Sequence, residues 1–285
     1  MMTLPRRIGP LLLTGALHET IWGGRNLTWL AGKTIPEGAS IGESWETDRD
    51  CVVRTGRLAG QTLAQVVAEY GARLIGSRAA ELFGPRFPLL AKFLDARQQL
   101  SVQVHPDDAD AQAHEHGTLG KTEVWYILHA EPGAQVVYGL KREASRDEVR
   151  AAIAANRLEG LLSTCEVKAG DVIFVPAGTV HAIGAGVALY ELQEYSDITY
   201  RLYDYGRLQA DGKPRQLHVE SALRVMHCSP ADGHVQPMAV ADATAPAGTH
   251  RVLVANRYFV LEELLLGDGS VASATVPASC QIVSV

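Results

Sequence analysis

The sequence predicts a mainly β protein, folded as a barrel or sandwich of short strands with helices inserted between them. Most apolar segments are short and are separated by turns that contain Gly or Pro, a pattern that favours all-β architectures over parallel α/β sheets. Residues 100–105 alternate apolar and polar side chains, which is the two-residue period of a strand. The chain shows no internal repeat of fixed period, so we do not expect a solenoid or a propeller.

The expected strands are short and lie mostly in the second half of the chain. Residues 1–60 are predicted to form short strands and turns. After a compact apolar run at 89–94, we predict strands at 100–105, 124–128, 135–138, 164–168, 171–175, 180–183, 187–195, 198–204, 258–266 and 280–285. Residues 229–250 are rich in Ala, Pro, Gly and Asp and are predicted to be a linker.

The expected helices begin at capping residues or keep the apolar spacing of a helix. Thr62 is a plausible N-cap for a helical region over 62–83, whose last part, 77–83, forms a second short helix. Ser145 is the expected N-cap of a helix over 145–156, with acidic residues in its first turn. Further helices are predicted at 107–116 and 218–226.

Composition limits the classes of protein to which this chain can belong. It has 285 residues, of which 47% are apolar and 20% charged, and this mixture can bury a sizeable core. The net charge is −6 and no basic run occurs, so we expect no nucleic-acid partner. An acidic total still permits a phosphorylated substrate, because a few local cations can hold it.

Cysteine spacing and the length of the apolar runs indicate a cytoplasmic protein. The four cysteines lie far apart and form no Cys-x-x-Cys pair, so we expect free thiols. The apolar run near the N-terminus is too short for a signal peptide. Nowhere do about eighteen apolar residues run together, so we expect no transmembrane helix and no membrane partner.

The segment Leu100-Ser-Val-Gln-Val-His105 places different chemistry on its two faces. Alternation sets Gln103 and His105 on one face and the apolar residues on the other. A strand of this kind fits a barrel with a polar interior. The alternative is a half-exposed edge strand with ordinary polar residues on its outer face.

A second segment, Gly170-Asp-Val-Ile-Phe-Val-Pro-Ala-Gly-Thr-Val-His181, combines a strand, a Gly-Pro turn and a returning strand that carries His181. The pattern G-D-x₄-P-x-G-x-x-H is more specific than a single histidine. It resembles the second motif of the cupin superfamily, whose small jelly-roll β-barrels hold a metal between facing strands. The alternative is a plain β-turn beside a surface histidine.

The third segment carries Glu123 in a strand otherwise rich in Trp, Tyr, Ile and Val. A buried carboxylate needs a cation or a metal to offset its desolvation. Two imidazoles and one carboxylate, from His105, His181 and Glu123, suit Zn²⁺, Fe²⁺ or Mn²⁺. Gln103 or water could supply a further oxygen. The alternative is an outward-facing glutamate on a half-exposed strand.

These segments, with three others in the same order, resemble the metal-dependent mannose-6-phosphate isomerases in their short bacterial form. The matching stretches are residues 42–46, 88–95, 100–108, 120–128, 175–182 and 200–207. The resemblance implies a cupin barrel that binds one Zn²⁺ per chain, other divalent metals being alternatives. The implied ligands are Gln103, His105, Glu123 and His181. It also implies that Arg201 lies in the active site and Lys121 in the substrate pocket.

The implied reaction interconverts D-mannose 6-phosphate and D-fructose 6-phosphate through a cis-enediol. Arg201 or Lys121 could stabilise charge on the substrate oxygens or hold the phosphate. Glu191 lies ten positions before Arg201, a separation that the resemblance supports for an active-site carboxylate, and is our candidate base. The alternatives are a structural glutamate, a solvated Lys121 and an ion-paired Arg201. For the whole protein, they are a cupin Fe(II) oxygenase and a non-catalytic sugar-binding cupin.

The resemblance also predicts two domains. Residues 1–230 would form a catalytic cupin domain with helical insertions, and residues 231–285 a linker and part of a second cupin-like barrel. A half-built barrel exposes unpaired strand edges. We therefore expect this end to be either poorly stable or covered by a partner chain, a homodimer being one arrangement.

Overall fold

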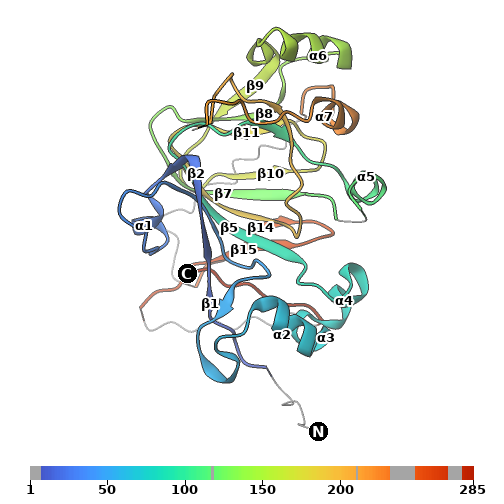
Figure 1. The fold of residues 1–285 in the computed structure, drawn as a ribbon. Coiled ribbons are helices and arrows are strands. Elements are labelled where there is room, and N and C mark those ends of the chain that lie inside the picture. The colour runs from blue at the N-terminus through green and yellow to red at the C-terminus, as the bar shows by residue number, and fades with distance from the viewer. Residues whose placement is uncertain (1–7, 117–118, 210, 232–247, 269–277) are drawn as a thin grey trace.

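Two antiparallel sheets face each other in the computed structural model, which describes residues 8–116, 119–209, 211–231, 248–268 and 278–285 (Figure 1). The first sheet has the order β10 (Val172–Val175), β7 (Glu123–Ala130), β12 (Val187–Glu194), β5 (Leu89–Ala96), β2 (Ala16–Gly24) and β3 (Ile41–Trp45). The second has the order β13 (Tyr200–Tyr203), β6 (Val102–Val104), β11 (His181–Ile183), β8 (Gln135–Leu140) and β9 (Leu162–Glu166). The predicted mainly β, barrel-like architecture is confirmed.

The inner faces of the two sheets enclose one apolar cluster. Leu94, Trp125 and Ile127 come from the first sheet and meet Val136 and Ile183 from the second. Because side chains alternate along each strand, every second residue continues this inner face. Toward the start of β7 and the end of β12, the inner face changes from apolar to charged side chains, and the candidate site lies at that end.

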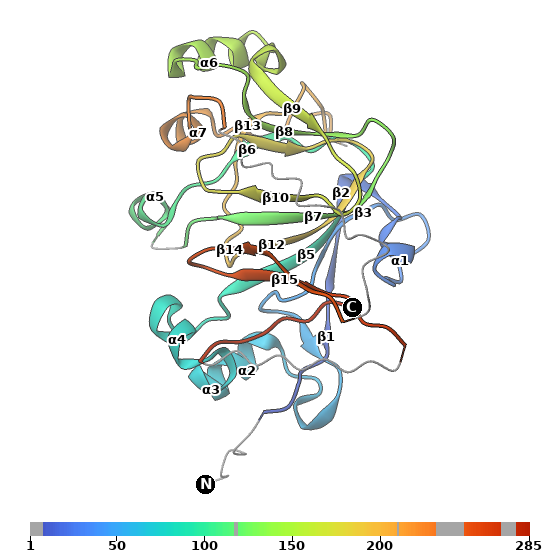
Figure 2. The same cartoon turned by 180° about the vertical axis from the view of Figure 1, so that it is seen from behind.

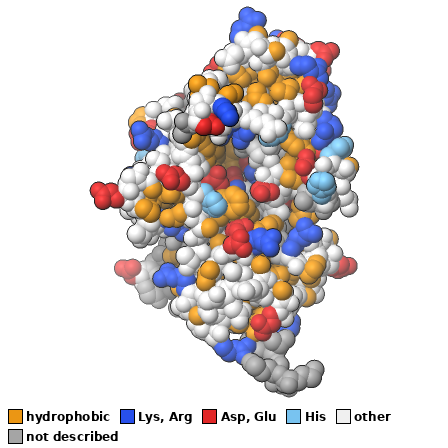
Figure 3. Space-filling model, viewed as in Figure 1, with side chains coloured by type: hydrophobic (Ala, Val, Ile, Leu, Met, Phe, Trp, Pro, Cys, Tyr) orange, Lys and Arg blue, Asp and Glu red, His pale blue; other side chains and the backbone are white. Residues whose placement is uncertain are grey.

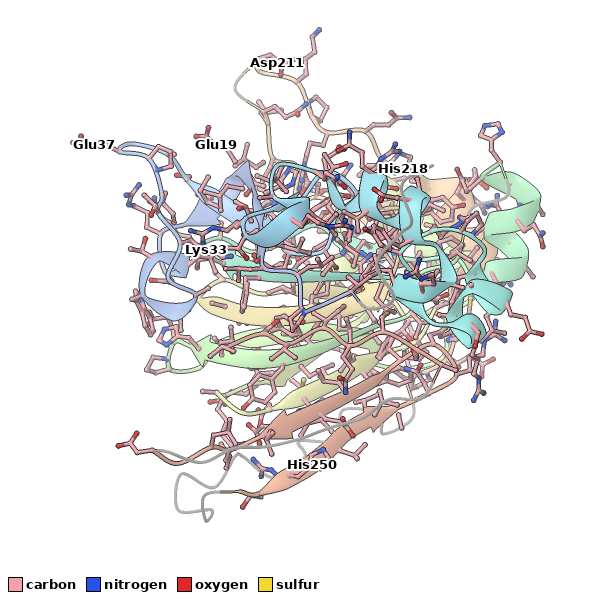
Figure 4. The ribbon with its side chains drawn as sticks, turned by 90° about the horizontal axis from the view of Figure 1, so that it is seen from below. Glu19, Lys33, Glu37, Asp211, His218 and His250 are labelled. Carbon is pink, nitrogen blue, oxygen red and sulfur yellow. The ribbon has the colours of Figure 1, made fainter. Side chains whose placement is uncertain are left out.

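The outer faces of both sheets are covered by other elements. Helices α6 (Arg146–Ala154) and α7 (Val219–Val225) pack on the second sheet (Figure 1). The hairpin of β14 (His250–Ala255) and β15 (Val260–Leu264) packs on the first sheet through Leu253 and Phe259. Figure 4 shows this hairpin, with His250 labelled on it, beside the strands of that sheet.

The remaining elements lie at the periphery of the two sheets. They are α1 (Leu27–Leu30), β1 (Leu13–Thr14) paired with β4 (Val52–Val53), a 3₁₀ turn at Gly56–Leu58, α2 (Leu63–Tyr70), α3 (Ala72–Ile75), α4 (Ser77–Phe83), α5 (Asp108–His114) and a 3₁₀ turn at Leu158–Leu161. The predicted caps are confirmed, since Thr62 forms a capping box with Gln65 and the Ser145 hydroxyl accepts from the Glu148 amide. No helix in the described part of the chain is long and apolar enough to cross a membrane.

The C-terminal region differs from its prediction. Residues 280–285 form no strand; instead Ile282 packs on the outer face of the first sheet and the Ser284 hydroxyl contacts the Tyr190 hydroxyl at 3.1 Å. The incomplete second barrel is not confirmed, because the described residues beyond 247 contain one two-stranded hairpin that packs on the first sheet. Most of the predicted linker, residues 232–247, lies outside the described residues. The domain boundary and the homodimer stay predictions. All four cysteines are free, as predicted.

Candidate metal centre

Three buried side chains converge at the charged end of the barrel interior. His105, Glu123 and His181 each offer one ligand atom, and these atoms lie within 4.8 Å of one another. Nε2 of His105 lies 3.4 Å from Oε2 of Glu123, and Nε2 of His181 lies 3.4 Å from Oε1 of the same carboxylate. The three residues come from both sheets. Glu123 begins β7 of the first sheet, whereas His181 begins β11 of the second and His105 directly follows β6 of the second.

Backbone contacts hold both histidine segments in place. His181 lies opposite Gln103 across the pairing of β11 and β6. The turn before β11 contains Gly178, which has a positive φ of 84° and donates its amide to the carbonyl of His105 at 2.9 Å. The glycine of the second sequence motif therefore joins the two histidine-bearing segments directly.

A hydrogen bond from Nδ1 to a backbone carbonyl orients each imidazole ring. Nδ1 of His105 donates to the carbonyl of Ile198 and Nδ1 of His181 to that of Thr179, each at 2.8 Å. Because a carbonyl only accepts hydrogen bonds, each Nδ1 carries the proton and each Nε2 presents a lone pair toward Glu123. Carbonyl acceptors behind the imidazole are the usual support of a metal-binding histidine.

Both histidines are neutral, which is the form that binds metal. Burial, reinforced by the positive charge of Lys121, lowers the pKa of His105 to about 3. Burial also lowers the pKa of His181. Although burial acts in the opposite direction, the positive charge of Lys121 holds the pKa of Glu123 well below its usual value. The cluster thus combines two neutral imidazoles with one carboxylate.

In the described part of the chain, two of the ligand atoms lack hydrogen-bond partners, which a bound cation would replace. Nε2 of His105 and Oε2 of Glu123 are fully buried, yet neither has a hydrogen-bond partner of good geometry within the described residues, although Nζ of Lys121 lies 3.1 Å from Oε2. Leaving a buried polar atom unsatisfied costs about 1–3 kcal/mol. A divalent cation between these atoms would satisfy both at once.

Gln103 faces the same point from β6. Its side-chain amide lies 3.3 Å from Nε2 of His181. The oxygen and nitrogen of a glutamine amide are assigned from their hydrogen-bond partners, and rotation by 180° would place Oε1 toward the cluster. Gln103 therefore stays a candidate for a fourth ligand.

Two candidate cations, Lys121 and Arg201, belong to the segments that carry the cluster. The side chain of Lys121 is buried, and its Nζ lies 3.1 Å from Oε2 of Glu123, so it is not a solvated lysine. Arg201 pairs with Gln103 across β13 and β6, which puts the two side chains on one face. Arg201 donates to the Ser101 hydroxyl at 3.1 Å and to the Gln216 carbonyl at 2.8 Å. Among the described residues it forms no ion pair.

Glu191 joins the cluster through a tryptophan. The indole N–H of Trp125 donates to Oε1 of Glu123 at 3.0 Å and to Oε2 of Glu191 at 3.2 Å, so it bridges the two carboxylates. Burial, together with the negative charge of Glu123, raises the pKa of Glu191. Lys92 pairs with Glu191 across β5 and β12, and its Nζ lies 3.3 Å from Oε1 of that carboxylate.

Lys92 is the residue that sequence reasoning missed. Its Nζ also lies 3.5 Å from Oε2 of Glu43, so one buried ammonium serves two carboxylates. Although burial favours the neutral amine, the charges of Glu191 and Glu43 raise its pKa and keep it cationic. The available signal was a single lysine within an apolar strand, Leu89–Ala96.

The view in Figure 3 shows this side of the molecule hollowed between the levels of β11 and β7, with acidic and basic side chains around the hollow.

Comparisons with known proteins show which family this chain resembles. Residues 11–124 match a family model described as the catalytic domain of phosphomannose isomerase type I. A mannose-6-phosphate isomerase of Streptococcus mutans is 43% identical over 221 residues, which span 76% of this chain and 67% of the relative. Mannose-6-phosphate isomerase ManA of Bacillus subtilis is also 43% identical, over 76% of this chain and 68% of its own.

Solved structures give the same result for the fold. A crystal structure of the mannose 6-phosphate isomerase of Bacillus subtilis matches with a TM-score of 0.75 and 36% identity, covering 89% of this chain and 79% of that one. A structure of a protein from Archaeoglobus fulgidus, described as a putative mannosephosphate isomerase, matches with a TM-score of 0.63 at 23% identity, over 79% of this chain and 70% of that one, and supports the fold alone.

Proposed function

Because the chain belongs to the type I family of mannose-6-phosphate isomerases, we propose that it binds one Zn²⁺ through His105, Glu123, His181 and Gln103. It would interconvert D-mannose 6-phosphate and D-fructose 6-phosphate through a cis-enediol. The observation that supports the metal site most strongly is the pair of buried Nε2 lone pairs that face one buried carboxylate. Fe²⁺ and Mn²⁺ suit the same donors.

When bound, the metal would supply a Lewis acid for the substrate oxygens at C1 and C2. The protein holds its donor atoms before the metal arrives, since backbone carbonyls orient both imidazoles. Lys121 lies beside the carboxylate ligand and would stabilise negative charge that develops on a substrate oxygen.

Glu191 is the residue to which we assign proton transfer between C1 and C2. Its pKa is raised by burial and by the charge of Glu123, which suits a group that must both take and return a proton. Oε2 accepts the Trp125 N–H, whereas Oε1 accepts no hydrogen bond of good geometry within the described residues. The ammonium of Lys92 forms an ion pair with Oε1 at 3.3 Å, so Trp125 and Lys92 together would hold the carboxyl group in place.

Arg201 is our candidate for binding the substrate phosphate. It is half-buried and shares a face with Gln103, a candidate ligand. Its partners are one hydroxyl and one carbonyl, and both are neutral. The positive charge is consequently free to pair with a phosphate.

One assay tests this function. Mannose 6-phosphate is supplied and fructose 6-phosphate is followed in metal-replete protein and after thorough removal of metal with a chelator. We expect turnover that disappears with the metal and returns with Zn²⁺. Metal-replete protein without turnover would overturn the proposed reaction, and turnover that survives complete metal removal would overturn the role of the metal.

Two variants separate metal binding from substrate binding. His181→Ala should lose both metal and activity, because it removes a ligand atom. Arg201→Ala should keep its metal and show a higher KM for mannose 6-phosphate, because it removes only the proposed phosphate contact. Metal content measured on the purified variants decides between the two kinds of loss.

A further inference from the structure

The turn of the C-terminal hairpin contacts the segment that leads into α5, about 150 residues earlier in the chain. The Tyr258 hydroxyl donates to Oδ2 of Asp108 at 3.0 Å, and the Arg257 guanidinium donates to the same oxygen. The side chain of Asn256 shapes the turn by accepting from the amides of Tyr258 and Phe259, at 2.8 and 2.9 Å. Figure 2 shows the turn between β14 and β15 on the same side of the molecule as α5.

The other oxygen of Asp108 holds the backbone that carries Lys121. The amide of Gly120 donates to Oδ1 of Asp108 at 3.0 Å, and the amide of Lys121 donates to the carbonyl of Pro106, also at 3.0 Å. A Cβ at Gly120 would lie 2.5 Å from the carbonyl carbon of Asp107, so the two backbones are in direct contact. The position of Lys121 thus depends on that of residues 106–108.

Glu194 holds the same backbone from the opposite side. Its Oε1 accepts the amide of Thr122 at 2.8 Å, and its own amide donates to the carbonyl of Thr122 at 3.1 Å. Burial and the negative charge of Asp108 raise the pKa of Glu194 to about 8. At neutral pH one carboxyl group is therefore protonated and the other ionised, and the two hold residues 120–122 between them.

We propose that Tyr258 and Arg257 are positioning residues for Lys121, and that they act through Asp108. The inference rests on the proposed function, because it takes Lys121 to be the group that stabilises charge on the substrate. It gives the C-terminal hairpin a part in catalysis, although none of its residues lies in the metal cluster.

Tyr258 should contribute more than Arg257. The Arg257 side chain is 72% exposed, and ion pairs in that environment contribute little. Burial and the charge of Glu194 raise the pKa of Tyr258, which favours the protonated hydroxyl that donates to Asp108. Hydrogen bonds to a charged acceptor are among the stronger ones.

The test begins with Tyr258→Phe, which removes the hydroxyl and keeps the ring. We expect kcat for mannose 6-phosphate to fall by about 3- to 10-fold, less than the full strength of a charge-assisted hydrogen bond, because Tyr258 acts on Lys121 only through Asp108. KM and metal content should stay unchanged. Amide exchange of the peptide that contains Gly120 and Lys121 should become faster. Arg257→Gln should change both quantities less.

Tyr126→Phe is the matched control. The Tyr126 hydroxyl bonds Oε1 of Glu263 at 2.7 Å and so ties the same hairpin to β7 without contacting Asp108. If the hairpin acted only by stabilising the fold, both variants would give the same loss of activity. We expect Tyr126→Phe to keep the kcat of the wild type.

A double-mutant cycle tests whether Tyr258 acts through Lys121. In a Lys121→Gln background, Tyr258→Phe should have no further effect on kcat, because the residue through which it acts is gone. An undiminished effect in that background, or unchanged amide exchange of residues 120–121 in Tyr258→Phe, would overturn the inference. An inactive wild type whose Gly120–Lys121 exchange still responds to Tyr258→Phe would instead overturn the proposed function.

Discussion

The two ends of the barrel interior are built from the same strands but are stabilised differently. Along β12, Leu189 lies in the apolar cluster, whereas Glu191 and Gln193 face the charged end. Along β7, Ile127 and Glu123 show the same contrast. The apolar end is held by packing, in which a side chain of similar volume can replace another. At the charged end each group depends on a particular partner, since removing one leaves a buried charge uncompensated.

Removing the shared carboxylate should have the largest effect. Glu123→Ala takes away a proposed metal ligand and leaves the ammonium of Lys121 buried without its counter-charge. We expect loss of metal, a fall in kcat/KM of more than about 1000-fold, and destabilisation by about 3–5 kcal/mol. Metal content, kinetics and urea unfolding measure the three quantities. Glu131→Ala is the control, because the Glu131 side chain is exposed. Its metal content, kinetics and stability should match those of the wild type.

The second variant changes the proposed proton acceptor and leaves Glu43 as the counter-charge of the Lys92 ammonium. Glu191→Gln retains the shape of the side chain but cannot take a proton. We expect kcat to fall by about 10²- to 10⁴-fold, the usual contribution of a general base, while metal content stays at the wild-type level. A kcat within a factor of three of the wild type would remove Glu191 from the mechanism.

At the apolar end we expect a substitution to lower stability and to leave activity nearly unchanged. Leu189 is fully buried, and Leu189→Ala should destabilise the fold by about 2–5 kcal/mol through lost burial and the cavity it leaves. Well below the unfolding temperature, kcat and KM should stay close to the wild-type values. A strong loss of kcat in folded Leu189→Ala protein would show that the two ends are not separable.

The smallest expected effect is a pH dependence at the edge of the charged end. Because the pKa of Glu194 is about 8 in the folded protein, above its ordinary value, its contribution to stability is full below about pH 4 and is lost as pH rises through 8. Glu194→Gln should therefore flatten the decline of unfolding free energy between pH 5 and 8, by about 1–3 kcal/mol. Denaturant unfolding at several pH values tests this, and parallel profiles for the two proteins would contradict it.

Local patterns in the sequence predict much of the fold. The alternation at residues 100–105 and the caps at Thr62 and Ser145 are decided within a few residues, and the structure agrees with them. The predicted strand at 280–285 was wrong, because an apolar segment becomes a strand only if another strand is available to pair with it. Here that segment meets the side chains of a sheet face instead.

In the candidate site, too, local motifs identify some residues, whereas others depend on contacts between distant segments. His105 and His181 each belong to a recognisable local motif, so the sequence indicates them. Lys92 resembles any lysine in a short strand, and its place in the interior follows only from its pairing with Glu191, about 100 residues away. The contact between Tyr258 and Asp108 is equally long-range.

The carbonyls behind the two imidazoles have a consequence for substitutions at the positions that supply them. Ile198 and Thr179 orient the rings through main-chain oxygens, which every amino acid possesses. Substitutions at either position leave the acceptor in place as long as the backbone keeps its course. Substitutions at positions 198 and 179 are therefore expected to leave the orientation of both imidazole rings unchanged.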